Sequence, residues 1–423
     1  MRVDQRVRRV AHPPGPPVDA AAPARDGEGS AAAATRRGRL EFLDALRGIA
    51  VLTVVVQHIG DYQWIGLLGW SEHWFRLGEF GVLLFFCCSG FIIPASLERR
   101  NDLVEFWIGR AFRLWPLYLT VTGVLLAAWE RVPRPAGYRP VEDSVVNLTM
   151  LQVFSTRPLL IGASWTLGYE LVFYLLVSVL FLLGWHRRST ASATVLLICA
   201  LGLGGATTTY MLQLRPEHWW TQPAAALLLV GLAASRLPSW RLRAATVGMA
   251  LVVIAALANR PHPAYFTLLV FSCMFVGTVL YRWTAAQTSG RNAAAVFGLA
   301  LVVIVAAQHT WHHGYTEPLS GETPRWWTEA ATFLAAVLVF GAAFLLRHRR
   351  WPRPLTYLGA ISYSVYLLHA LVLIVVPELP GRPWVNFVTL SAITLVGSVL
   401  THHLLEQPAI AFGRRIAAAR RTA

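Results

Sequence analysis

The sequence predicts an all-α protein, a polytopic transmembrane helical bundle of ten to twelve spans with both termini in the cytoplasm. Of its 423 residues, 55% are hydrophobic and only 14% are charged, and the mean hydropathy is +0.49. Apolar stretches long enough to cross a bilayer recur from Leu43 almost to the C-terminus, separated by clusters of Arg, Pro or Gly. This pattern leaves no room for a large soluble domain.

Twelve segments meet the criterion of about 20 residues per span. We expect the spans at 41–60, 78–97, 112–129, 166–184, 191–212, 222–235, 241–259, 264–283, 292–310, 328–347, 356–376 and 384–404. If successive spans cross the membrane in alternating directions, Arg-rich connectors such as "WHRRST" and "RHRRWPRP" lie on the same side as both termini. The positive-inside rule identifies that side as the cytoplasm. If the short sixth segment does not cross, this agreement is lost, so we expect an even count of twelve or ten.

The chain divides into three regions by composition. Residues 1–38 are rich in Ala, Pro, Gly and Arg and lack an apolar core, which predicts a disordered cytoplasmic tail. No apolar stretch typical of a secretory signal peptide occurs in the first 30 residues. Residues 39–412 form one membrane domain, and residues 413–423 are expected to be a basic cytoplasmic tail.

The net charge of +15 comes from arginine alone, because the sequence contains no lysine. The arginines lie in short connectors rather than on one patch interleaved with aromatic residues, which favours a topological role over nucleic-acid binding. The four cysteines, Cys87, Cys88, Cys199 and Cys273, lie in apolar segments without metal-ligand spacing. We therefore expect them to pack in the core, and we expect no metal site.

The first span carries two polar groups that are costly in a bilayer. In "RGIAVLTVVVQH", Arg47 and His58 are eleven residues apart, so on an α-helix they share one face and differ in depth by about 16 Å. A structural reading pairs Arg47 with Asp44 and leaves His58 as an interfacial residue. A functional reading makes His58 an acid or base and Arg47 a ligand of phosphate.

Glu170 is the next unexpected group. It lies in "SWTLGYELVFYLL", four residues after Thr166 and four before Tyr174, so a hydroxyl, a carboxylate and a phenol share one helix face. A carboxylate this far inside a span is expected to be functional or paired. Its candidate roles are to orient an imidazole or to bind a sugar hydroxyl.

Two further segments each allow a structural and a functional interpretation. In "GEFGVLLFFCCSGF", the small residues predict close helix packing, and Ser89 can also donate a hydrogen bond. In "FWIGRAFRLWPLYL", Arg110 and Arg113 fit either plain positive-inside topology or an anchor for an anionic cofactor.

The order of these motifs resembles that of acyltransferase family 3, whose members are bacterial membrane enzymes that O-acylate carbohydrates, surface glycans and macrolide-type metabolites. "LDALRGIAVLTVVVQH" is similar to the first-helix motif of that family, "FGVLLFFCCSGFII" to the second-helix motif and "RAFRLWPLYL" to the following Arg-rich segment. "SWTLGYELVFYLL" resembles the motif that contains the acidic residue of the family. "LGAISYSVYLLHALV" resembles the penultimate-helix motif, which carries over Ser362, Tyr363, Tyr366 and His369.

The resemblance covers about residues 40–408, with two departures. Leu83 stands where the family often has Asp, so any role of that acid is absent here, and the usual span count is ten. The resemblance implies an acyl-CoA-dependent O-acyltransferase of the bacterial cell membrane, with acetyl-CoA or a short-chain acyl-CoA as donor and a hydroxyl of a sugar, glycan or macrolide-like compound as acceptor.

Within that resemblance, the residues receive provisional roles. We expect His58 and Glu170 to be catalytic, with His58 as general base, and Arg47, Arg110 and Arg113 to bind the CoA phosphates. Substrate-binding or oxyanion-stabilising roles are assigned to Ser89, Tyr363, Tyr366 and His369. Direct transfer and an acyl-histidine intermediate both remain open.

Two other classes of protein compete with this reading. A secondary transporter of a small polar or anionic solute also combines many spans with a few buried charges, but we find no internal repeat and no matched pair of broken spans. A non-catalytic membrane scaffold would leave the buried Arg, His and Glu unexplained.

Overall fold

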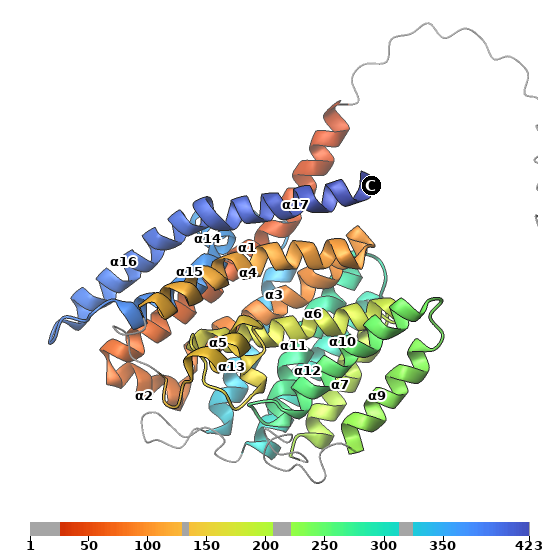
Figure 1. Ribbon diagram of the computed structural model, residues 1–423, viewed down its shortest axis with the longest axis horizontal. Coiled ribbons are helices and arrows are strands. Elements are labelled where there is room, and N and C mark those ends of the chain that lie inside the picture. The colour runs from red at the N-terminus through yellow and green to blue at the C-terminus, as the bar shows by residue number, and fades with distance from the viewer. Residues whose placement is uncertain (1–25, 129–134, 206–220, 313–324, 423) are drawn as a thin grey trace, which may run out of the picture.

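The computed structural model describes residues 26–128, 135–205, 221–312 and 325–422, and every regular element within these ranges is helical (Figure 1). The elements in chain order are α1 (Asp26–Gln63), α2 (Ile65–Trp74), α3 (Leu77–Arg100), α4 (Leu103–Ala127), α5 (Pro140–Leu148), η1 (Gln152–Phe154), η2 (Gly162–Ser164), α6 (Trp165–Leu182), α7 (Ser189–Leu203), α9 (Thr221–Ala234), α10 (Trp240–Ala258), α11 (Ala264–Thr284), α12 (Gly290–Trp311), α13 (Trp326–Leu345), α14 (Arg353–Ala360), α15 (Ser362–Val375), α16 (Pro383–Thr401), η3 (His402–Glu406) and α17 (Gln407–Thr422). The all-α prediction is confirmed for these residues.

Within the described ranges, eight helices are long and apolar enough to cross a membrane, and the bent pair α14 and α15 makes a ninth if it forms one span. Each segment predicted to span falls at least partly in a helix, although the ends of 112–129 and 191–212 lie outside the described residues. Helices α4, α7 and α9 are not among the eight. The prediction of ten to twelve spans and of cytoplasmic termini stays a prediction.

Both terminal regions contain helix within the described residues. Helix α1 begins at Asp26 and so includes residues 26–38, which composition had assigned to disorder, while residues 1–25 lie outside the described residues. Helix α17 includes nearly all of the basic segment 413–423. Both segments are rich in alanine and arginine, which have high helix propensity and offset the lack of an apolar core.

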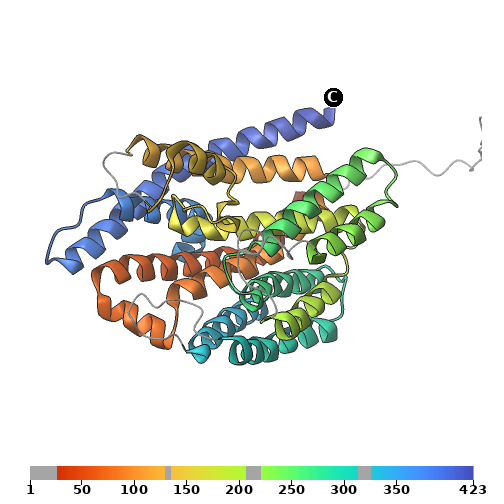
Figure 2. The same ribbon diagram turned by 60° about the horizontal axis from the view of Figure 1, so that its bottom comes forward.

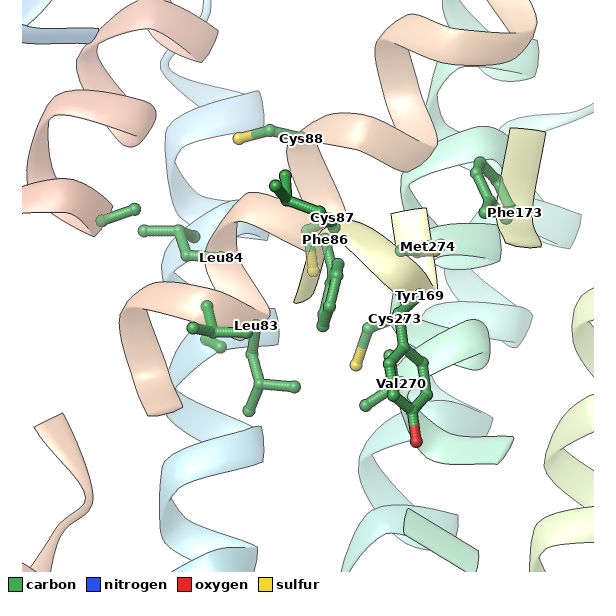
Figure 3. Packing of buried hydrophobic residues seen from close by; sticks show 14 of the residues in the cluster. Leu83, Leu84, Phe86, Cys87, Cys88, Tyr169, Phe173, Val270, Cys273 and Met274 are labelled. Carbon is green, nitrogen blue, oxygen red and sulfur yellow. The ribbon is translucent and has the colours of Figure 1, made fainter. Parts of the chain in front are cut away.

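Helices α3 and α11 form the centre of the bundle and are the most deeply buried of the candidate spans. They cross at two glycines: a Cβ on Gly90 would lie 1.8 Å from the carbonyl oxygen of Met274, and a Cβ on Gly277 would lie 2.2 Å from that of Cys87. Figure 3 shows α3 and α11 side chains, among them Cys87 and Cys273, packed together in this core. Cys87, Cys88 and Cys273 are buried, as predicted, whereas Cys199, which was also expected in the core, is only partly buried.

A second glycine contact joins the first span to the bent pair. A Cβ on Gly359 would lie 1.7 Å from the carbonyl oxygen of Asp44, and a Cβ on Gly48 would lie 2.2 Å from that of Leu355. Helix α14 therefore packs directly against α1, and the chain then bends by 69° between α14 and α15. This contact brings the polar residues of α15 beside those of α1.

The C-terminal helices run along one side of the bundle, where α17 lies beside α4 (Figures 1 and 2). Phe412 packs edge-on against Phe112, and Arg420 forms an ion pair with Asp102, which also caps the N-terminus of α4. These contacts fix the helix that carries Arg110 and Arg113.

Candidate active site

Five helices enclose a cavity of about 170 Å³ that we call the arginine cavity. Helix α1 contributes Arg47, α4 contributes Arg110 and Arg113, and α6 contributes Glu170, which is the one carboxylate in the lining. The rest of the lining comes mainly from α3 and α15. Three guanidinium groups facing one carboxylate make this cavity strongly attractive to an anion.

Arg110 and Arg47 differ in how they are held. The Nη2 of Arg110 donates to the Ser96 hydroxyl over 3.1 Å, and its guanidinium packs on the rings of Phe106 and Tyr174. Arg47 makes no hydrogen bond or close ion pair with any residue that the structure describes, so the pairing with Asp44 is not formed. Its charge is thus available to a ligand.

Glu170 is held by two hydroxyl groups. The Tyr174 hydroxyl donates to its Oε1 over 2.6 Å, and the Ser89 hydroxyl donates to the same oxygen over 3.2 Å. The predicted proximity of Tyr174 is therefore confirmed. Glu170 lines the arginine cavity, whereas His58 lines a second cavity.

That second cavity has a volume of about 310 Å³ and the opposite charge, and we call it the carboxylate cavity. It contains His58 together with four carboxyl groups and a single arginine. The carboxyl groups and the arginine are those of Asp61, Glu72, Glu79, Glu329 and Arg76. Trp165, His262, Phe266 and Tyr366 supply aromatic walls.

Arg76 bridges two of these acids. Its Nε lies 3.0 Å from Glu79 Oε2, and its Nη1 lies 3.3 Å from Glu329 Oε1. His262, in the connector between α10 and α11, has its Nδ1 3.0 Å from the Tyr169 hydroxyl. Burial lowers the pKa of His262 to about 4, even though Glu329 acts in the opposite direction, so this imidazole is neutral at neutral pH.

The two cavities adjoin at Val82 and Tyr366, which line both. The Tyr366 hydroxyl donates to the carbonyl of Ala163 over 2.8 Å and also contacts the Thr166 hydroxyl at 2.8 Å. This side chain is held at both ends, since its ring packs against His369 with centroids 5.4 Å apart. The boundary between the cavities is therefore one ordered aromatic side chain and one valine.

His58 meets His369 across the α1–α15 contact. The two rings are stacked with centroids 5.1 Å apart, and His58 Nδ1 lies 3.2 Å from His369 Nε2. His369 Nδ1 lies 3.3 Å from the carbonyl oxygen of Val365, which can only accept, so this nitrogen carries the proton of neutral His369. Its Nε2 then accepts from His58 Nδ1, which leaves His58 Nε2 with a free lone pair.

The structure thus divides the predicted site residues between the two cavities. The arginine cavity is lined by Arg47, Ser89, Arg110, Arg113, Glu170, Tyr363 and Tyr366, while His58 lines the carboxylate cavity with His369 as its partner. His58 contacts His369 and also has a backbone hydrogen bond with Val54, and Glu170 is bonded to Ser89 and Tyr174 instead. The Tyr363 hydroxyl donates to the Leu114 carbonyl over 2.6 Å, so its proton is already used.

Sequence reasoning missed the acids and Arg76 of the carboxylate cavity. Asp61 and Glu79 lie at helix ends, and Glu72 and Glu329 lie on separate helices, so each resembles an ordinary interfacial charge when considered alone. Only tertiary packing brings them together. The one available signal was that most of the acids outside the tails lie on the same predicted side of the membrane as His58.

The comparison with protein families decides the class of this chain. The model of acyltransferase family 3, which describes an acyltransferase domain, matches residues 40–403. The chain belongs to acyltransferase family 3. It is an acyltransferase, and its apolar helices make it a multi-pass membrane protein.

Several curated proteins are similar to this acyltransferase. It is 25% identical to the acyltransferase MdmB of Streptomyces mycarofaciens, over 89% of this chain and 93% of that protein. It is 23% identical to the putative peptidoglycan O-acetyltransferase YrhL of Bacillus subtilis, over 86% of this chain and 54% of YrhL. It is 26% identical to the O-acetyltransferase OatA of Staphylococcus aureus, over 39% of this chain and 29% of OatA. No solved structure matches the chain significantly.

Proposed function

We propose that this membrane O-acyltransferase moves an acetyl or short-chain acyl group from acyl-CoA to a hydroxyl group of a carbohydrate or glycosylated metabolite, with His58 as general base. The observation that carries the proposal is the pair of adjoining cavities with opposite charge, one basic and one containing an imidazole with a free nitrogen. Two substrates of different charge can approach each other from these two cavities.

The arginine cavity is the donor site in this proposal. Phosphate groups of CoA fit Arg47, Arg110 and Arg113, because guanidinium groups bind phosphate through paired, charge-assisted hydrogen bonds. The lack of a hydrogen bond or close ion pair at Arg47 within the described residues supports this assignment, since a cation inside a span is costly until an anion pairs with it. The positive-inside rule places the opening of this site on the cytoplasmic face of the bacterial membrane, where acyl-CoA is made.

The acyl end of the donor reaches the boundary formed by Val82 and Tyr366. The acceptor hydroxyl lies in the carboxylate cavity and gives its proton to His58 Nε2 as its oxygen attacks the thioester carbonyl carbon. The carbon–sulfur bond then breaks, the new ester is released, and the CoA thiolate takes the proton back from His58. His369 holds His58 in the tautomer that this step requires.

Glu170 and Ser89 lie on the donor side of this reaction. Glu170 balances part of the arginine charge and fixes Ser89 through their hydrogen bond. The hydroxyl protons of Ser89, Tyr363 and Tyr366 already serve Glu170 and two backbone carbonyls, so none of these three side chains is assigned as the oxyanion donor. Tyr363 and Tyr366 instead form part of the wall of the arginine cavity.

The test uses purified wild-type protein in lipid vesicles with acetyl-CoA labelled in the acetyl group and a mixture of hydroxyl acceptors. The proposal predicts free CoA and labelled ester in equal amounts, both dependent on the acceptor. A transporter would move label across the vesicle without releasing CoA, and a scaffold would do neither. Either result would overturn the proposal.

A further inference from the structure

One hydroxyl group in the lining of the arginine cavity differs from the others. The lining contains five hydroxyl side chains, and four of them are hydrogen-bonded to protein groups, namely Ser89, Thr166, Tyr363 and Tyr366. The fifth, Ser362, is 0% exposed, and its Oγ forms no hydrogen bond with any residue that the structure describes. Buried hydroxyl groups are normally hydrogen-bonded, so Ser362 indicates a ligand in the cavity.

Ser362 is also the first residue of α15. Because the chain bends by 69° between α14 and α15, a new helix of 14 residues begins here. The residue at the N-cap position is Ile361, whose apolar side chain cannot accept from the first N–H groups of the helix. Such N–H groups carry partial positive charge, and a helix N-terminus beside a hydroxyl donor is a suitable environment for a phosphate group.

Arg47 lies at the same end of the cavity. The close contact of Gly359 with the Asp44 carbonyl joins α14 to α1 three residues before Ser362 and three residues before Arg47. Both of these residues line the arginine cavity. A water molecule could accept from the Ser362 hydroxyl, but it would not balance the guanidinium charge inside a span, whereas an anion does both.

We propose that Ser362 and the N-terminus of α15 form, together with Arg47, a phosphate-binding site in the arginine cavity, in which Ser362 Oγ donates a hydrogen bond to a phosphate oxygen. The identity of the ligand as acyl-CoA rests on the proposed function. The site itself recognises the phosphate group, so a small inorganic phosphate compound can report on it without any transfer of an acyl group.

The experiment measures binding of inorganic diphosphate, CoA and pantetheine to the purified full-length protein by titration calorimetry. Ser362→Ala removes a single oxygen atom and should weaken diphosphate and CoA by about tenfold or more, because hydrogen bonds to charged groups are among the stronger ones. Pantetheine lacks phosphate, so its affinity should not change. Acetyl transfer from labelled acetyl-CoA is measured in parallel.

Ser364→Ala is the matched control on the same turn of α15. The Ser364 hydroxyl is buried but donates to Glu406 over 2.8 Å, and Ser364 is outside the lining of the arginine cavity. This variant should bind CoA as wild type does and should melt at a lower temperature, because a buried hydrogen bond is lost. The ligand-free Ser362→Ala protein should melt no lower than wild type, since its hydroxyl has no protein partner to lose.

The readouts separate the phosphate site from the proposed function. Unchanged affinity of Ser362→Ala for diphosphate and CoA overturns the phosphate site even if wild type transfers acetyl groups. Equal weakening of pantetheine overturns it too, because the hydroxyl would then contact the arm of CoA, and so does a wild type that binds neither diphosphate nor CoA. If diphosphate binding depends on Ser362 but no acceptor is acetylated, the phosphate site stands and the proposed function fails.

Discussion

The Nδ1 of His58 lies 3.2 Å from the Nε2 of His369, so the proposed general base on α1 contacts an imidazole from α15. His369 is 1% exposed and is itself fixed by the Val365 carbonyl. A chain of two histidines therefore ends on a backbone carbonyl, and it determines which nitrogen of His58 faces the carboxylate cavity.

Removal of this partner should impair the chemical step while leaving donor binding intact. In His369→Ala, His58 can change tautomer and orientation, and we expect kcat to fall by roughly 10- to 100-fold with little change in KM for acetyl-CoA. In His369→Gln, the side-chain oxygen can accept from His58 Nδ1, so activity should be partly restored. Steady-state kinetics of both variants would test this, and equal loss in the two would argue against an orienting hydrogen bond.

Arg47 should matter for donor binding more than for the chemical step. Replacing it by Met removes an unpaired charge from the arginine cavity, and we expect KM for acetyl-CoA to rise by about tenfold or more. Arg349, which is exposed in the connector after α13, provides the control Arg349→Met. A larger effect on kcat than on KM would contradict a binding role for Arg47.

The glycine contact between α1 and α14 should be intolerant of a methyl group. A Cβ at Gly359 would lie 1.7 Å from the Asp44 carbonyl oxygen, and a backbone atom cannot move aside as a flexible side chain can. We expect Gly359→Ala to be destabilised by at least about 1–3 kcal/mol. Thermal unfolding in detergent measures this.

Gly248, in the middle of α10, provides the matched substitution for that experiment because a Cβ there would meet nothing within 4 Å. Gly248→Ala should be neutral or stabilising by up to about 1 kcal/mol, since alanine favours helix more than glycine does. Equal behaviour of the two variants would show that the α1–α14 contact is looser than the structure indicates.

His262 should give the protein a measurable sensitivity to acid. Burial lowers the pKa of His262 to about 4, whereas an imidazole in an unfolded chain titrates near 6.5. The unfolded state therefore binds the extra proton first, and the contribution of His262 to stability is complete above about pH 6.5 and is lost as the pH falls toward 4.

We therefore expect the melting temperature of wild type to fall more steeply between pH 7 and pH 5 than that of His262→Gln. The difference should correspond to a loss of about 2 kcal/mol by pH 5. Parallel unfolding curves for the two proteins at all pH values would show that His262 titrates normally.

The sequence predicted the helical class and half of the site. Arg47, Arg110, Arg113 and Glu170 could be recognised because each is polar within or beside an apolar span, and the structure places all four on one cavity. The pairing of His58 with His369 could not be read from the sequence, since 311 residues separate them. It depends on where two glycines allow α14 to cross α1.

The acidic lining of the carboxylate cavity could not be predicted from the sequence either. Its acids come from α1, α2, α3 and α13, and none of them follows a periodic pattern with another. Their common property is depth and orientation in the folded bundle, which only tertiary packing determines. Helix formation in residues 26–38 was not expected, because polar composition was weighted above helix propensity, whereas residues 413–423 were predicted only to be a basic tail.

The role of His58 is the central claim, and it is tested most directly by measuring donor binding and acetyl transfer on the same variants. His58→Ala and the bulkier His58→Gln should bind acetyl-CoA as wild type does, while kcat for transfer falls by about 10²- to 10⁴-fold. His403→Ala, at an exposed histidine on η3, should behave as wild type. Transfer by His58→Gln at the wild-type rate would contradict the assignment of His58 as the general base.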